Sequence, residues 1–132
     1  MRGVSALQVM LDEFQDAPVD VFAVWESVLP TDLAPPSTAV LGRFHARNTR
    51  QYWDPDKLLS DQLIAAAKAN PERLKAGHGI PDVVWDAVLF YGPDVEWKDD
   101  VPFPEHYAAP VLDVVDEVRA ELRTRTGTLK VR

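Results

Sequence analysis

The sequence predicts a single domain of the α/β class, and three observations support this. The chain has 132 residues, which is close to the commonest size of one domain. Its 46% hydrophobic and 27% charged residues are typical of a folded globular protein. Apolar residues at helical spacing alternate along the chain with short β-branched runs, which is typical of an α/β layer fold.

The first half of the chain predicts a helix, a buried strand and a long connection. Apolar residues at three- and four-residue spacing predict a helix over residues 4–14. Residues 19–25 form a β-branched and aromatic run with one charge, so we expect a strand covered on both faces. Prolines interrupt residues 29–53, where we expect a connection with one short helix capped by Ser37 or Thr38.

The second half predicts a helix, a β-hairpin and a final helix. Asp54 and Pro55 suit the N-cap and first position of a helix that ends before Pro71. Residues 83–91 are the strongest strand signal, and a turn at 92–94 leads to an expected antiparallel partner at 95–97.

A proline-rich connector over residues 99–110 precedes the last helix, which starts at Val111 and is expected to end near Gly127. The domain should therefore span residues 1–127, with 128–132 as a C-terminal tail.

Charge limits the classes of partner. Twenty-one acidic and fourteen basic residues give a net charge of −7, which disfavours nucleic acid and anionic membrane surfaces. The basic group Arg43, His45, Arg47 and Arg50 is expected to be a solvated loop face rather than an anion site. No apolar run is as long as a membrane span requires, and the N-terminus lacks the uninterrupted apolar core of a signal peptide, so we expect a cytoplasmic protein.

The order of predicted elements resembles the thioredoxin-like superfamily with its first strand missing. The most telling piece is Gly79-Ile80-Pro81 ahead of the strand at 83–91 and the turn at 92–94. Residues 24–32 and 51–55 are also similar to a group of uncharacterised bacterial thioredoxin-like proteins. The resemblance implies a three-layer α/β sandwich from which the leading β-strand is absent.

The resemblance also implies properties of the site. In thioredoxin-like proteins the proline before the hairpin follows a cis peptide bond and borders the site where extended substrates dock, so Pro81 would be cis and Ile80 would offer its backbone. Redox members carry a Cys-X-X-Cys pair between the leading strand and the first helix, whereas this chain has no cysteine. The absent strand is central, so the strands at 19–25 and 83–91 must pair directly, or a second copy must cover the edge in a homodimer.

No other catalytic or metal-binding motif is present in the sequence. His45, His78 and His106 lack ligand spacing, no Gly-X-Ser-X-Gly elbow or phosphate-binding loop occurs, and we expect neither a metal nor a cofactor. Glu26 and Asp32 follow the predicted buried strand, where carboxylates either do acid–base work or lie solvated in a loop.

We therefore expect a non-redox binding or scaffold domain with a protein or peptide ligand. The residues assigned to its binding face are Glu26, Asp32, Tyr52, Trp53, Ile80 and Pro81. Two alternatives stay open. One is a fragment of a thiol–disulfide oxidoreductase whose Cys-X-X-Cys lies upstream of Met1, and the other is a structural unit that builds oligomers.

Overall fold

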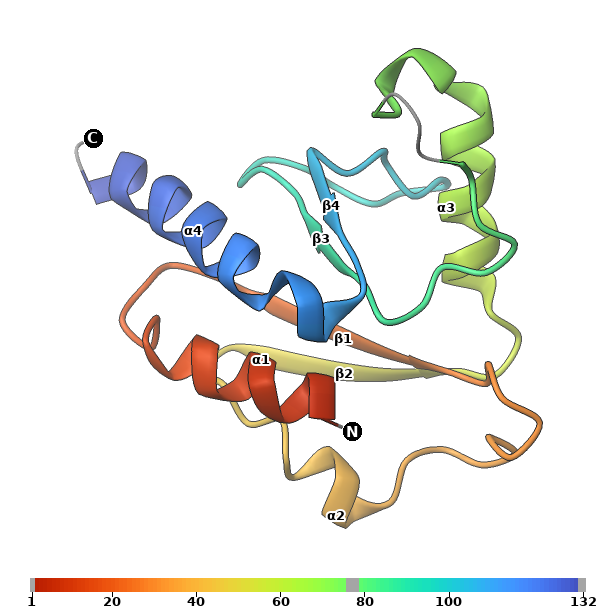
Figure 1. Ribbon diagram of the computed structural model, residues 1–132, viewed down its shortest axis with the longest axis horizontal. Coiled ribbons are helices and arrows are strands. Elements are labelled where there is room, and N and C mark those ends of the chain that lie inside the picture. Colours follow the sequence, from red (N-terminus) through yellow and green to blue (C-terminus); the bar gives the residue numbers. More distant parts are fainter. Residues whose placement is uncertain (1, 76–78, 131–132) are drawn as a thin grey trace.

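Figure 1 shows the computed structural model, which describes residues 2–75 and 79–130. The fold is mixed α/β, with a parallel sheet β1–β2 and an antiparallel sheet β3–β4. In chain order the elements are α1 (Arg2–Asp12), β1 (Val21–Glu26), α2 (Thr38–Leu41), β2 (Thr49–Asp54), α3 (Leu58–Ala69), the 3-10 turn η1 (Pro71–Arg73), β3 (Val88–Phe90), β4 (His106–Ala108) and α4 (Val111–Lys130).

Strand β2 lies inside the segment that the sequence predicts as a connection. It pairs with β1 in parallel register, from Val21 opposite Thr49 to Glu26 opposite Asp54. The strand was missed because one of its inward positions is polar. The Gln51 side chain donates from Nε2 to the carbonyl oxygens of Leu41 and Phe44, each at 3.0 Å, which satisfies a group that would otherwise be costly to bury.

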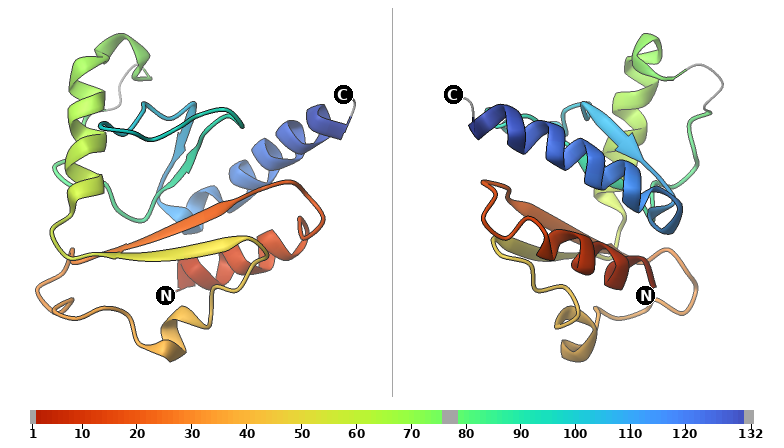
Figure 2. Two further views of the ribbon diagram at one scale, coloured as in Figure 1. Left: turned by 180° about the vertical axis from the view of Figure 1, so that it is seen from behind. Right: turned by 60° about the vertical axis from the view of Figure 1, so that its left-hand side comes forward.

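The two faces of the β1–β2 sheet differ. Val21 and Ala23 point inward and pack against the core. Phe22 and Tyr52 point the other way and are 55% and 51% exposed. Seen from behind, the sheet has α1 on its far side (left panel of Figure 2). The expectation that the strand at 19–25 is covered on both faces is therefore wrong.

The second sheet also corrects the sequence prediction. Only Val88–Phe90 of the run at 83–91 forms a strand, because Asp86 has a positive φ of 49° that interrupts extended backbone. Its partner is His106–Ala108, which lies in the predicted connector, and not the run at 95–97. Trp97 in that run is 47% exposed.

The helices follow the predictions closely, with two corrections at their ends. Helix α3 begins at Leu58 after Lys57, so Asp54 is not its N-cap, although Asp54 Oδ2 accepts a hydrogen bond from the Leu59 N–H at 2.9 Å. Helix α4 runs to Lys130 and therefore continues beyond Gly127 into the predicted tail. Ser37 caps α2 as predicted, with its hydroxyl accepting from the Val40 N–H.

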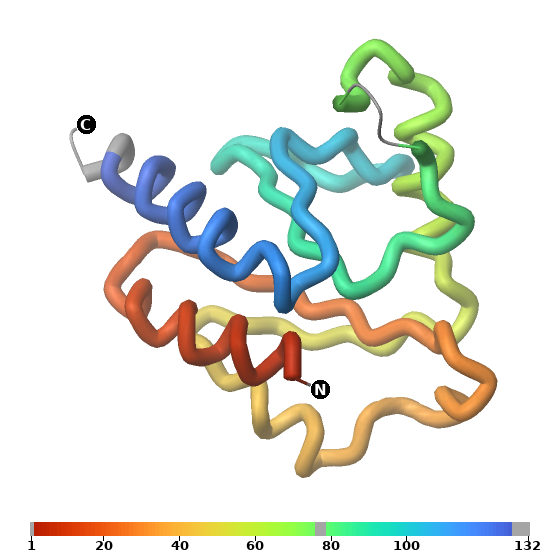
Figure 3. Tube along the Cα trace, viewed as in Figure 1, coloured from red at the N-terminus to blue at the C-terminus, as the bar shows by residue number. Residues whose placement is uncertain are grey.

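The core joins the two ends of the chain. Helix α1 packs against α4, and the tube in Figure 3 shows these helices side by side. The buried residues that form the core are Met10, Leu11, Phe44, Phe90, Ala108, Val118 and Leu122. Both sheets contribute to this core, but β1 and β3 are not hydrogen-bonded to one another. Direct pairing of the strands at 19–25 and 83–91, one of the two arrangements that the sequence left open, is absent from the described residues.

Candidate binding groove

A groove of about 570 Å³ lies between α3, residues 79–86 and residues 103–110. It is called the groove below. Most of its lining is apolar, and the side chains that contribute from its different walls include Leu63, Ile64, Ile80, Pro81, Val84, Leu89, Phe103 and Tyr107. A volume of this size falls in the range of ligand-binding clefts.

Three interactions hold α3 as one wall of the groove. The Val84 N–H donates to the Ser60 hydroxyl at 2.8 Å, and Ser60 is only 1% exposed. The Val101 N–H donates to Gln62 Oε1 at 3.1 Å. Beyond the end of α3, the Arg73 guanidinium lies 4.5 Å from the centroid of the Phe103 ring. These contacts fix the spacing between α3 and the two segments opposite it.

The β3–β4 sheet supplies another wall. Leu89 and Tyr107 are opposite one another in the antiparallel register, so their side chains share one face of the sheet. Both line the groove. Burial raises the pKa of Tyr107, and the negative charge of Asp86 raises it further. The Tyr107 hydroxyl is therefore protonated at neutral pH and available as a hydrogen-bond donor.

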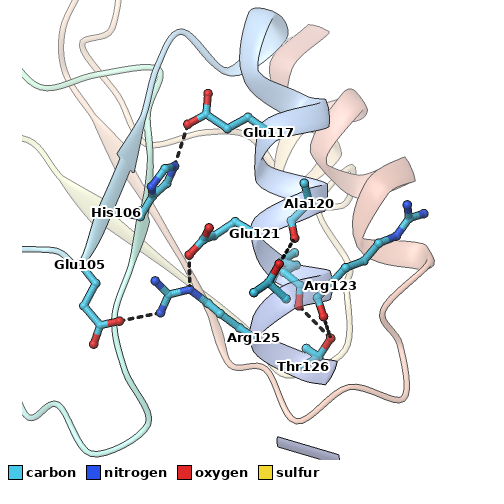
Figure 4. A network of polar contacts seen from close by, with 10 residues as sticks. Glu105, His106, Glu117, Ala120, Glu121, Arg123, Arg125 and Thr126 are labelled. Atoms are coloured by element: carbon cyan, nitrogen blue, oxygen red, sulfur yellow. Dashed lines mark hydrogen bonds and ion pairs between the residues drawn. The ribbon is translucent and has the colours of Figure 1, made fainter. Parts of the chain in front are cut away.

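The groove carries a polar pair where it meets α4. His106 Nε2 lies 2.7 Å from Glu117 Oε1 (Figure 4). The His106 and Phe90 rings are arranged edge to face, with their centroids 5.7 Å apart. Nearby, Arg125 donates to Glu105 and to Glu121, each at 2.7 Å. The bond to Glu105 connects α4 to the residue that directly precedes β4. These contacts hold the His106 ring at the edge of the groove.

The lining is mainly apolar and also includes charged side chains, among them Lys75 and Asp86. Among the described residues that line the groove, none carries a thiol or an aliphatic hydroxyl. The His106 ring is already engaged by Glu117, and no serine or threonine in the lining could use it as a base. The chemistry offered is therefore apolar contact together with hydrogen bonds and charges from the polar side chains of the lining.

The structure places Ile80 and Pro81 in the lining of the groove, whereas Glu26 is not part of that lining. The one cis peptide bond among residues 2–75 and 79–130 precedes Pro110, so the expectation that Pro81 is cis is wrong. Glu26 Oε1 accepts from the Ser60 N–H at 3.2 Å. Burial is the main cause of a raised pKa at Glu26. Ser60 thus connects the end of β1 to Val84 on the groove wall.

The other predicted site residues lie elsewhere. Asp32 closes its own loop, where Oδ2 accepts from the Leu29 N–H at 2.9 Å. Tyr52 lies on the exposed face of β1–β2 and Trp53 on the opposite face, in register with Trp25. The expected single binding face is therefore divided among the groove, a loop and two faces of one sheet.

Sequence reasoning missed the α3 side of the groove. Leu63 lies on the apolar side that the sequence predicts for this helix, but that pattern alone indicates packing and not a ligand site. Phe103 lies in a segment treated as a connector. Gly77 and His78, which precede Gly79-Ile80-Pro81 in the sequence, fall outside the described residues.

Three further findings concern metal binding, membrane spans and similarity to known proteins. In residues 2–75 and 79–130 no group of three His, Cys, Asp or Glu side chains is arranged to hold a metal ion. Within the same residues no helix has the length and apolar character that crossing a membrane requires. Comparison of the chain with models of protein families, with curated proteins and with solved structures finds no significant match.

Proposed function

We propose that this chain is a non-redox binding module that holds an extended apolar segment of another protein in the groove. The observation that carries the proposal is the groove itself, about 570 Å³ in volume and lined mainly by apolar side chains from separate segments of the chain. Burial of apolar surface supplies most of the affinity in such a site, at roughly 25 cal/mol for each Å² removed from water.

The form of the groove favours an extended peptide. Side chains of an extended peptide project alternately to two sides, so an open groove can take every second one while the others face solvent. The protonated Tyr107 hydroxyl and the Asp86 carboxylate offer a donor and an acceptor for peptide backbone groups. Few polar positions are needed, because they set the register while apolar contact supplies the affinity.

The proposal includes a thioredoxin-like fold. It differs from the sequence-based expectation in which strand of this chain corresponds to the leading strand of that fold. From β1 onward the order is strand, short helix, parallel strand, helix, antiparallel strand pair and helix. This order supports taking β1 as the leading strand of a thioredoxin-like core and α1 as an addition before it. One difference from that core is that β1 and β3 are not paired among the described residues.

This alignment favours a binding module over an oxidoreductase fragment. Redox members carry their cysteine pair directly after the leading strand, and on this alignment that place is taken by residues that follow Glu26. Ser27, Val28 and Leu29 stand there, and the chain has no cysteine. The proposal therefore assigns no thiol chemistry to the domain.

A peptide-binding measurement tests the proposal. The probes are short synthetic peptides labelled with fluorescein that carry Val, Ile, Leu or Phe at alternate positions, and binding is followed by fluorescence anisotropy. We expect some of these peptides to bind. The substitution Ile80→Asp places a charge on the groove wall and should weaken their binding by about 10-fold or more, because the charge loses hydration against apolar ligand surface.

The matched control is Val9→Asp, which introduces the same charge at a position of α1 that is 66% exposed and outside the groove. It should leave binding unchanged, and circular dichroism should show both variants to be folded. If no peptide of this kind binds, or if Ile80→Asp binds as the wild type does, the proposal is wrong.

A further inference from the structure

The exposed face of the β1–β2 sheet, called the outer face below, carries an ordered set of side chains. Parallel pairing places opposite residues on the same side of a sheet, and every second residue along each strand shares that side. The outer face therefore consists of Phe22, Val24 and Glu26 on β1 and of Arg50, Tyr52 and Asp54 on β2. This surface is separate from the groove.

The middle of the outer face is apolar and aromatic. The Phe22 and Tyr52 rings stack with centroids 6.5 Å apart and an interplanar angle of 22°. The Arg50 guanidinium lies 5.5 Å from the centroid of Phe22. Both rings are about half exposed, and the view from behind shows the sheet in front of α1 (left panel of Figure 2). The two rings thus form a stacked apolar surface that faces solvent.

Charge is segregated along the same face. Arg50 lies near the start of the strands, and no described carboxylate is within ion-pairing distance of it. Glu26 and Asp54 lie side by side at the end of the strands. Each accepts one backbone N–H of α3, and neither has an arginine or lysine within ion-pairing distance among the described residues. The face is basic at one end and acidic at the other.

We propose that the outer face binds a second copy of this chain in a two-fold dimer. Two such faces can meet with their strands antiparallel, about a two-fold axis that crosses the strands at the level of Tyr52. That arrangement brings Arg50 opposite Asp54 of the partner subunit and, by symmetry, the reverse. Tyr52 then meets Tyr52 of the partner subunit in the apolar middle. The same axis sets Phe22 opposite Glu26 of the partner subunit, so the basic end of each face meets the acidic end of the other and the self-complementarity of the surface lies in charge.

The dimer is weak and reversible. A face of two strands is small beside a standard interface of about 1,600 Å², and contacts at the low end of the size range are transient. Each copy also carries a net charge of −7, which opposes association. The two Arg50–Asp54 contacts offset part of that repulsion locally, and they are what selects this register over others.

Sedimentation velocity over a range of concentrations tests the dimer. We expect the wild type to pass from monomer to dimer as its concentration rises towards about 1 mM, the range of a weak complex. Arg50→Glu should raise the dissociation constant by about 10-fold or more, because like charges then face each other twice. Arg47→Glu makes the same change in net charge at an exposed position beside α1 and should leave the constant nearly unchanged.

A mixing experiment tests the register. Asp54→Lys should not form dimers by itself, whereas an equimolar mixture with Arg50→Glu should, since both contacts then join opposite charges. Because Asp54 also accepts the Leu59 N–H, circular dichroism must first show that Asp54→Lys is folded. If Asp54→Lys is not folded, the dissociation constants of Arg50→Glu and Arg47→Glu test the proposal instead. A wild type that stays monomeric, or equal effects of those two substitutions, would overturn the proposal.

Discussion

Ser60 connects three parts of the chain through one buried residue. Its N–H donates to Glu26 at the end of β1, and its hydroxyl accepts from the Val84 N–H on the groove wall. Ser60→Ala removes the acceptor of the Val84 N–H. A buried donor left without a partner costs about 1–3 kcal/mol, and we expect a loss near the lower end because Val84 is only partly buried.

Urea unfolding followed by circular dichroism measures this loss. The control is Ser37→Ala at the N-cap of α2, where the hydroxyl accepts the Val40 N–H at 3.4 Å in an exposed position. Its effect should be smaller than that of Ser60→Ala, because water can replace an exposed cap. Equal effects would show that the Ser60 hydroxyl does not hold the groove wall.

Glu26 makes stability depend on pH. Burial raises its pKa in the folded state, the hydrogen bond from Ser60 lowers it, and the neighbouring Asp54 raises it again. A carboxyl group whose folded pKa is raised binds its proton more readily when folded. Its contribution to stability is therefore fully present below the unfolded pKa and is lost as pH rises through the folded pKa.

Glu26→Gln removes this titration while it keeps an oxygen for the Ser60 N–H. We expect the variant to gain stability relative to the wild type as pH rises from about 4 to 7, the range above the ordinary glutamate pKa. The measurement is the free energy of unfolding of both proteins across that range. Asp32→Asn, in an exposed loop, is the control. A constant difference between Glu26→Gln and the wild type would contradict the prediction.

At the scale of elements, the helices were predictable and half of the strands were not. Helices α1 and α4 follow from apolar spacing because their inward positions are apolar. Strand β2 has Thr49, Gln51 and Trp53 on its inner side, so its pattern does not alternate between apolar and polar residues. Hydrogen bonds to backbone carbonyls make Gln51 acceptable there, and such bonds are visible only after folding.

The strand that pairs with β3 also could not be predicted from the sequence pattern. Local spacing favours a tight hairpin to residues 95–97. In the structure the Glu105 N–H donates to the Phe90 carbonyl at 2.9 Å, and the Tyr91 hydroxyl donates to the Pro102 carbonyl at 3.0 Å. These contacts hold the return strand eleven residues later than expected. They depend on packing between segments that are separate in the sequence, so no local pattern predicts them.

Two neighbours on α1 offer a test of the core. Met10 is 1% exposed and belongs to the core, whereas Val9 is 66% exposed. Met10→Ala should lower the free energy of unfolding by about 2–5 kcal/mol because it leaves a cavity. Val9→Ala should change it by less than about 0.5 kcal/mol. Chemical denaturation of both variants measures the two values, and similar losses would mean that α1 is docked through another face.

At the scale of the whole molecule, the groove could not be predicted because separate segments build it. Ile80 and Pro81 were named from the sequence, and the structure places both in the lining. The α3 and 103–110 walls come from parts of the chain that meet only in three dimensions. Tyr52 and Trp53 were assigned to the same site, but alternation along β2 sends them to opposite faces of the sheet.

The molecule divides into a well-packed part and a less packed part. The buried core residues come from α1, the β3–β4 sheet, α4 and the segment after α2, and none comes from α3. Helix α3 buries Ser60 and Leu63 and is held mainly by the contacts that form the groove wall. Elements with few buried apolar contacts open at lower free energy than the rest of a protein.

Hydrogen exchange should therefore show faster exchange in α3 than in α4, whose Val118 and Leu122 lie in the core. A peptide bound in the groove touches α3 directly, so it should slow exchange there in proportion to occupancy and leave α1 unchanged. Mass spectrometry of proteolytic fragments, with and without a fluorescein-labelled apolar peptide, measures both effects. Equal protection of α3 and α4 in the free protein would contradict the division into two parts. Slower exchange in α1 and not in α3 would place the peptide outside the groove.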